Sequence, residues 1–285
     1  MFNLLVTGSS GYLGSQFIKQ CAQKYRISQF SLQSQSLEDI DFDGLDAVLH
    51  CAGIVHQGQN VSSSEYDRVN TIYPVEMARL AKANGLKQFV FISSVSVYGP
   101  MEYIDEDSDC NPRTKYGKSK LEAENRLFEL NDCNFIVSIL RIPMIYGPQA
   151  PGNIQSIIRL VNYLPIIPLG NINNRRSFIS IQNLVYSIDQ ILKLQKEGIF
   201  LLSDDEPIST SSLVEILIRA ASKRRFIVNS MLLSPFVRLL MPKMYQKLWG
   251  DSFINSAESK KSLNLHFPVK VEDGLKKIST LEQYM

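Results

Sequence analysis

The chain has 285 residues, of which 20% are charged, and a formal net charge of +2 at pH 7. This length can bury a sizeable core, and the near balance of charge excludes a strong field that would attract nucleic acid. We therefore expect a globular protein with a small-molecule partner and no nucleic-acid partner.

The start of the chain, MFNLLV, runs directly into glycines and does not continue into the long apolar segment of a signal peptide. No stretch approaches the ~20 apolar residues that a membrane-spanning helix needs, so we expect no membrane span. The four cysteines are scattered without a C-x-x-C pair, which indicates reduced thiols. Together these features predict a cytoplasmic protein.

Short apolar or β-branched runs alternate with stretches of helical periodicity in the first 150 residues. The runs are NLLVTG (3–8), AVLHCAG (47–53), QFVFISS (88–94) and FIVSILR (135–141). This alternation is typical of βαβ units around a parallel sheet, so we predict an α/β fold. Beyond residue 150 prolines, asparagines and helical patterns dominate, which predicts a small substrate-binding lobe over residues 151–285.

A glycine-rich segment, VTGSSGYLGS (6–15), follows the first predicted strand and opens a predicted helix. Gly8, Gly11 and Gly14 have the spacing G-x-x-G-x-x-G. Glycine permits a sharp turn and the close approach of a pyrophosphate, and the helix N-terminus supplies unpaired N–H groups. An ordinary tight turn is the alternative, but the strand and helix on either side favour a dinucleotide site in residues 1–150.

The predicted cofactor is NAD or NADP, with NAD slightly favoured. In such folds an acidic residue at the end of the second strand commonly binds the ribose hydroxyls. The corresponding stretch, FSLQSQS (30–36), offers Ser31, Gln33 and Ser34, but neither a clear Asp nor an Arg. Asp39 or Asp41 is an alternative contact, to the adenine.

The heptapeptide TKYGKSK (114–120) places Tyr116 and Lys120 on one face of a predicted helix. An incidental pair on a solvated helix is the alternative. Ser93 and Ser94 end a predicted strand one crossover upstream, at the sheet edge where ligands bind. A serine and a tyrosine that converge there suggest an acid/base pair. Lowering a phenol pKa from ~10 to about 7 takes ~4 kcal/mol, which one ammonium ~4 Å away supplies.

Several ordered motifs carry a resemblance to a known family. They are TGSSGYLG (7–14), HCAG (50–53), FISSVSVYG (91–99), YGKSK (116–120) and RIPMIYGP (141–148). Together they resemble the extended short-chain dehydrogenase/reductases, the NAD-dependent epimerase/dehydratase family, that act on nucleotide sugars. The similarity is greatest to bacterial polysaccharide enzymes described as UDP-sugar 4-epimerases or UDP-4-keto-N-acetylhexosamine reductases.

The resemblance implies a Rossmann-like doubly wound parallel sheet with a small, mainly helical C-terminal substrate lobe, one segment of which returns to the sheet. It implies Tyr116 as general acid/base, Lys120 as the ribose contact that lowers the tyrosine pKa, and Ser94 as a partner of the sugar oxygen. Besides Tyr116 and Lys120, the implied cofactor contacts are Gly8, Gly11, Tyr12, Leu13, Gly14, Cys51, Ala52, Gly53, Asn70, Ser93 and Pro143. The implied substrate contacts are Ser94, Val95, Ser96, Tyr116, Asn153 and Arg176, whereas Arg175 is expected on a loop surface.

These residues imply an NAD(P)-dependent enzyme that acts at C4 of a nucleotide sugar. A UDP-hexose or UDP-N-acetylhexosamine 4-epimerase and a UDP-4-keto-6-deoxy-N-acetylhexosamine 4-reductase need the same catalytic residues, so both stay open. A non-catalytic dinucleotide sensor is disfavoured because Tyr116 and Lys120 are both present. The chain departs from the family at Met144, often Asn, and at Ser180 and Gln182, often His and an acid.

Family members often form homodimers through two helices of the Rossmann domain, and the helix that starts near Tyr116 would be one of them. His50 and His56 lack carboxylates at ligand spacing, so no metal site is predicted. The acidic run DEDSDC (105–110) is predicted to be a solvated loop. The segment SMLLSPFVRLLMPKMY (230–245) is either an amphipathic helix on a membrane or partner or, as we favour, an ordinary helix packed on its own domain.

Overall fold

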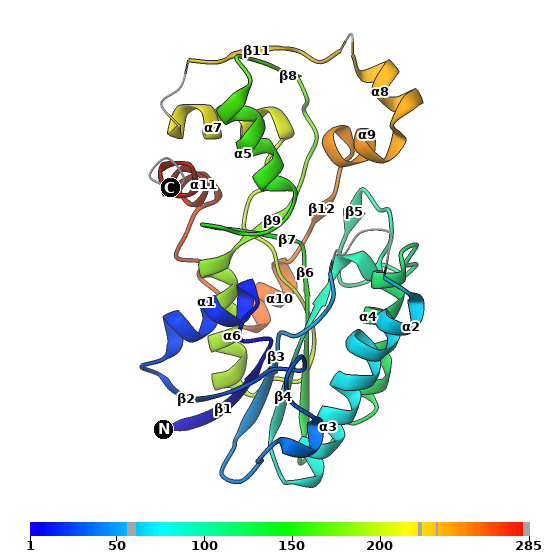
Figure 1. Cartoon of the computed structure of the whole chain (residues 1–285), viewed down its shortest axis with the longest axis vertical. Helices are drawn as coiled ribbons and strands as arrows, with labels where there is room; N and C mark the ends of the chain where they lie inside the picture. The colour runs from blue at the N-terminus through cyan, green and yellow to red at the C-terminus, as the bar shows by residue number, and fades with distance from the viewer. Residues whose placement is uncertain (56–60, 222–223, 232, 282–285) are drawn as a thin grey trace.

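The computed structural model describes residues 1–55, 61–221, 224–231 and 233–281. A parallel sheet carries helices on both faces, and a smaller lobe lies beyond the upper edge of the sheet (Figure 1). Strands and helices alternate along the first half of the chain, as their apolar periodicity predicts.

The main sheet has six strands in the order β10-β6-β4-β3-β1-β2, and every pairing is parallel. The strands are β1 (Phe2–Thr7), β2 (Tyr25–Phe30), β3 (Ala47–His50), β4 (Gln88–Ser94), β6 (Ile136–Ile142) and β10 (Gly198–Leu201). The chain moves outward from β1 to β2, then returns to the other side of β1, which creates a switch point between β1 and β3. The predicted doubly wound parallel fold is confirmed.

The sheet is buried on both faces because its strands are nearly continuous apolar runs. Leu4 and Val6 contact one core together with helices α1 (Tyr12–Cys21) and α6 (Ile181–Leu194). Leu5 points to the opposite core, which includes helices α3 (Tyr73–Ala83) and α4 (Lys115–Phe128). Period-two alternation along each strand therefore supplies both cores.

The lobe is built mainly from helices α5 (Asn153–Tyr163), α7 (Thr210–Ala220) and α11 (Val271–Leu281). Short strand pairs accompany them: β8 (Ile166–Gly170) with β11 (Phe226–Asn229), β7 (Met144–Tyr146) with β9 (Phe178–Ser180), and β5 (Tyr103–Ile104) with β12 (Phe253–Ile254). Although they follow residue 150, β10 is a strand of the main sheet and α6 packs on one of its faces. The domain boundary at residue 150 stays a prediction.

A buried carboxylate, Asp204, ties the lobe to the sheet. It accepts a hydrogen bond of 2.6 Å from Tyr146 Oη of β7 and one of 2.8 Å from Asn183 Nδ2 of α6. The backbone N–H of Ser180, which caps α6, donates to both of its oxygens. Burial raises the pKa of Asp204, and the tyrosine and amide donors act in the opposite direction.

The segment 230–245 does not form the single packed helix that we predicted, although its second half contacts the lobe through Met244. It folds into two short helices, α8 (Ser234–Leu240) and α9 (Pro242–Trp249), and none of their residues is fully buried. Pro242 ends α8 because the residue before a proline is driven out of helical geometry, and Met241 has φ −137° and ψ 60°. Within the described part of the chain, none of the helices combines the length and apolar character needed to span a bilayer.

Candidate active site

The glycine turn after β1 is tightly packed. Gly8 has φ +64°, and a Cβ atom on it would lie 2.7 Å from the backbone nitrogen of Ala52. A Cβ on Gly14 would collide with the carbonyl oxygen of Gly8. Gly11 is the N-cap residue of α1 and has no side chain that could accept a hydrogen bond from the first turn. The N–H groups of Tyr12 and Leu13, at the start of the helix, have no partner within the helix. The turn therefore fits a pyrophosphate at the switch point of the sheet.

Residues 51–54, which follow β3, are held in place by two polar side chains. Thr7 Oγ1 accepts a hydrogen bond of 3.3 Å from the N–H of Ala52. The buried side-chain amide of Asn70 accepts a hydrogen bond of 2.8 Å from the N–H of Ile54. It also donates a hydrogen bond of 3.0 Å to the carbonyl oxygen of Ile54. A Cβ on Gly53 would lie 3.5 Å from Lys120 Nζ, so this segment and the lysine border the same space.

Lys120 is buried on the sheet-facing side of α4. Its Nζ donates a hydrogen bond of 2.9 Å to the carbonyl oxygen of Ile92 and lies 4.4 Å from the centre of the Phe91 ring. Burial lowers the pKa of Lys120 to about 8, and the nearby Glu124 carboxylate acts in the opposite direction. The ammonium is thus fixed beside Gly53 and Cys51.

Tyr116 and Ser94 meet at the carboxyl end of β4. Ser94 forms a hydrogen bond with Tyr116 that lowers the pKa of the phenol. Burial has the larger effect and raises the pKa of Tyr116 to about 12, to which Tyr66 and Glu124 contribute. Ser94 also caps the turn η3 (Val95–Val97), where it accepts a hydrogen bond of 3.2 Å from the N–H of Ser96.

We predicted that Lys120 lowers the pKa of Tyr116 to about 7, and for the protein alone this prediction is wrong. The net shift of the tyrosine pKa is upward, because burial outweighs the hydrogen bond with Ser94. A simple Coulomb argument omits the loss of hydration that disfavours a buried phenolate. The ammonium is instead directed to the carbonyl of Ile92.

Ser93 does not expose its hydroxyl to the site. Successive residues of a strand point to opposite faces, and the Ser93 hydroxyl donates to the Glu124 carboxylate. Ser93 is fully buried in this position. The cofactor contact predicted for Ser93 would therefore come from its backbone.

Sequence reasoning missed a buried ion pair behind the candidate site residues Tyr116 and Lys120. Arg141 donates to Glu124 at 2.6 Å from Nη2 and 3.0 Å from Nε, and to Tyr98 Oη at 2.9 Å. Glu124 is only 1% exposed. It stands four residues after Lys120 and eight after Tyr116, so the period of α4 was the signal that could have found it. The Glu124–Arg141 ion pair connects α4 to β6, and the hydrogen bond from Ser93 to Glu124 connects α4 to β4.

The lobe contains a cavity of about 360 Å³ that includes Arg176 and Met144. Arg176 Nη1 donates to the carbonyl of Gly250 at 3.1 Å, and burial lowers its pKa. Arg175 instead places its guanidinium 3.9 Å from the centre of the Phe253 ring. The side chain of Asn153, at the start of α5, lies outside what the structure describes. Pro143 is buried directly after β6, at the carboxyl edge of the sheet.

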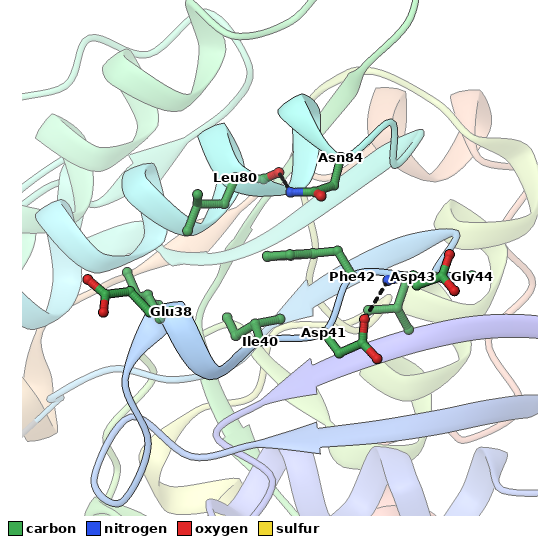
Figure 2. A pocket seen from close by; sticks show the side chains of 10 residues that line it. Glu38, Ile40, Asp41, Phe42, Asp43, Gly44, Leu80 and Asn84 are labelled. Carbon is green, nitrogen blue, oxygen red and sulfur yellow. Dashed lines mark hydrogen bonds between the residues drawn. The ribbon is translucent and has the colours of Figure 1, made fainter.

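A second cavity, of about 480 Å³, lies between residues 37–45 and the end of α3 (Figure 2). Asp41 and Gly44 line it close to the residues that enter β3, which is the amino end of that strand. The adenine contact considered for Asp41 is therefore not supported, because a dinucleotide at Gly8 lies at the carboxyl edge. Asp39 accepts a hydrogen bond from the N–H of Ser36.

His50 is a buried structural side chain. Its ring stacks on Phe89 and Phe91 with centroid distances of 5.8 and 5.9 Å, and burial lowers its pKa to about 3. Among the described residues there is no cluster of three or more His, Cys, Asp or Glu that could hold a metal, and His56 lies outside them. In the acidic run, Asp107 and Asp109 are exposed, whereas Glu106 accepts a hydrogen bond from Ser259.

A glycine turn at the switch point, with Tyr116, Ser94 and Lys120 at the same sheet edge, defines a dinucleotide-dependent α/β enzyme. The chain belongs to the NAD dependent epimerase/dehydratase family, whose sequence model matches residues 4–201. The enzyme therefore uses a nicotinamide dinucleotide, and the packing around Gly8 and Gly14 fits that group.

Two relatives have similar sequences. UDP-glucose 4-epimerase of Vibrio cholerae is 30% identical, over 96% of this chain and 93% of its own length. The N-acetyl-alpha-D-glucosaminyl-diphospho-ditrans,octacis-undecaprenol 4-epimerase of Escherichia coli O157:H7 is 26% identical, over 67% of this chain and 63% of its own length. The chain is thus a relative of sugar 4-epimerases.

Two solved structures have the same fold. UDP-glucuronic acid 4-epimerase from Bacillus cereus in complex with NAD has a TM-score of 0.79 at 19% identity, covering 99% of this chain and 97% of that chain. RMD from Pseudomonas aeruginosa complexed with NADPH also has a TM-score of 0.79 at 19% identity, covering 98% of both chains. At this identity the likeness establishes the fold.

Proposed function

We propose that this enzyme is a 4-epimerase of a UDP-hexose or UDP-N-acetylhexosamine. The observation that carries the proposal is the hydrogen bond between Ser94 and Tyr116 beside the buried Lys120. The similarity to Vibrio cholerae UDP-glucose 4-epimerase over nearly the whole chain supports the same reaction.

In the proposed reaction, Tyr116 as phenolate accepts the proton of the C4 hydroxyl while Ser94 hydrogen-bonds the same oxygen. When bound, the dinucleotide supplies the acceptor and the donor of the C4 hydride. Loss of one proton and one hydride leaves a ketone at C4. After the 4-keto sugar rotates within the site, Tyr116 would return the proton to the C4 oxygen, and C4 would receive the hydride on its opposite face. The net result is an isomerisation that consumes no reductant.

Tyr116 must ionise although burial raises its pKa to about 12. A unit positive charge ~4 Å away at an effective dielectric near 20 contributes ~4 kcal/mol, equal to ~3 pKa units. Oxidised nicotinamide carries such a charge. We therefore assign the lowering of the tyrosine pKa to the cofactor together with Ser94, and we assign Lys120 to the nicotinamide ribose. NAD is the proposed dinucleotide, because no Arg follows β2 to accept a 2′-phosphate.

The nucleotide end of the substrate is proposed to occupy the cavity of the lobe. Arg176 and Lys247 both line it and supply the positive charge that a diphosphate requires. Val95 and Ser96 follow Ser94 directly and are proposed to contact the sugar. Among the predicted substrate contacts, Arg176 is thus proposed to bind the diphosphate, and Asn153 at the start of α5 belongs to the same lobe.

The test is to incubate the purified enzyme with UDP-glucose or UDP-GlcNAc, without added nicotinamide, and to follow the C4 epimer by NMR. We expect the epimer to form without net production of reduced cofactor, because the cofactor is regenerated in each cycle. The 4-reductase alternative predicts a different result. It would give no epimer, but would reduce a UDP-4-keto-6-deoxy sugar with stoichiometric loss of NAD(P)H absorbance.

The cavity also favours a second substrate, N-acetylglucosamine on a polyprenyl diphosphate. Apart from its two cations, most of the cavity lining is apolar, including Ile154, Ile157, Leu160, Leu169, Phe178 and Leu213. The name of the Escherichia coli relative describes an epimerase of such a lipid-linked sugar. Running the same assay on both compounds separates them. Turnover of the lipid-linked sugar alone would overturn the UDP-sugar assignment.

A further inference from the structure

Helix α8 presents large apolar side chains to solvent. Phe236, Leu239 and Leu240 are 66%, 81% and 75% exposed, although a soluble helix normally buries one apolar face. The chain on either side adds further exposed apolar residues, Met231, Leu233 and Met241. We refer to these six residues as the distal patch. Scattered exposed apolar residues are ordinary, but six within eleven positions mark an interaction surface.

The distal patch is held in a fixed position at one end of the molecule. Figure 1 shows α8, β8 and β11 at the end of the lobe that lies farthest from the main sheet. Ser230, between β11 and α8, donates to the carbonyl of Gly170 from both N–H and hydroxyl, at 3.0 and 2.9 Å. At the other end of β11, Phe226 pairs with Ile166, and both are exposed. The apolar surface therefore extends along the edge of the lobe.

The charge around this surface has a single sign. The sequence has no Asp or Glu from residue 216 to residue 250. Four described cations in that stretch, Arg224, Arg225, Arg238 and Lys243, form no ion pair with an acid of the described chain, whereas Lys247 lines the lobe cavity. Arg225 is anchored by hydrogen bonds of 2.8 Å to the carbonyls of Val161 and Asn162. The net charge of the whole chain is only +2, so positive charge is concentrated here.

We propose that the distal patch docks on the surface of an anionic phospholipid membrane. Exposed Leu, Met and Phe side chains would enter the boundary between headgroups and acyl chains, and the surrounding Arg and Lys side chains would pair with anionic headgroups. A second copy of this chain fits less well, because a two-fold interface through this patch would bring the same cations together without acids to offset them. This inference rests on the surface alone and does not depend on which sugar the enzyme converts.

The test is flotation of the full-length enzyme with vesicles of phosphatidylcholine that contain 30% phosphatidylglycerol. At 50 mM NaCl we expect the protein to partition at least tenfold more strongly into these vesicles than into pure phosphatidylcholine. Raising NaCl to 500 mM should weaken binding at least fivefold, because surface electrostatics is screened. An enzyme that stays with the unbound fraction under all these conditions would overturn the proposal, even where sugar turnover is intact.

A pair of matched variants tests which surface binds. Leu239→Glu/Leu240→Glu should lower vesicle partition at least tenfold and leave sugar turnover unchanged, because neither residue lines the cavity with Arg176. The control is Leu194→Glu/Ile199→Glu, which adds the same charge at exposed aliphatic residues of α6 and β10 and should bind as the wild type does. Equal loss in both variants would contradict the proposal. Self-association abolished by the first variant, without vesicle binding by the wild type, would assign the patch to a second copy instead.

Discussion

Replacing Glu124 by Gln removes the carboxylate from a buried ion pair and leaves the Arg141 guanidinium with a neutral partner. The two groups are 2.6 Å apart and nearly inaccessible to solvent. Breaking one partner of such a pair costs about 3–5 kcal/mol, because the remaining charge is buried without compensation. Unfolding entropy of ~2.1 cal/mol/K per residue gives about 0.6 kcal/mol/K for this chain, so Tm should fall by about 5–8 °C.

Circular dichroism at increasing temperature measures this shift, and the same helix offers a matched control. Glu122 pairs with Arg126 at 2.7 Å, but both are about half exposed, so Glu122→Gln should lower Tm by less than about 1 °C. Glu124→Gln combined with Arg141→Met should be less destabilised than Glu124→Gln alone, since no unpaired charge remains. Equal Tm values for the two single Glu variants would refute the reasoning.

Three further changes probe the cofactor turn, the acid/base group and the lobe. Gly8→Ala should abolish NAD binding measured by calorimetry, because the added Cβ would collide with the backbone of Ala52. The control is Gly44→Ala, at φ +66° with open space around it, which should cost about 1 kcal/mol in stability and leave NAD binding intact. Ser94→Ala removes the hydrogen bond that lowers the pKa of Tyr116, the proposed acid/base group. The kcat at pH 7 should therefore fall about 10–100-fold, and the rising limb of the pH–rate profile should move to higher pH. A pH–rate profile identical to that of the wild type would contradict this role. Arg176→Gln should raise KM for the nucleotide sugar about tenfold with little change in kcat, whereas Arg175→Gln should change KM less than twofold in the same initial-rate assay.

The fold and the centre of the candidate site could be predicted because their signals are local. The glycine spacing after the first strand and the four-residue spacing of Tyr116 and Lys120 each depend on one element. Ser94 was found because the carboxyl ends of parallel strands share one edge. These patterns need no knowledge of distant contacts.

Other features depend on tertiary burial that no local pattern reports. Glu124 and Arg141 are 17 residues apart on different elements, and only packing makes their charges a buried pair. The direction of the Tyr116 pKa shift reverses because burial outweighs nearby charge. Ten of the 16 residues in segment 230–245 are apolar, which favours a packed helix, and only the tertiary structure shows that α8 leaves its apolar side chains exposed.

The most direct test of the account is the turnover of Tyr116→Phe at matched cofactor occupancy. The variant keeps the ring and loses only the oxygen that is proposed to exchange the C4 proton. NMR of UDP-GlcNAc or UDP-glucose should show epimer formation slowed at least 10³-fold, in line with the loss of a general acid/base group. Epimerisation within threefold of the wild-type rate would contradict the central claim.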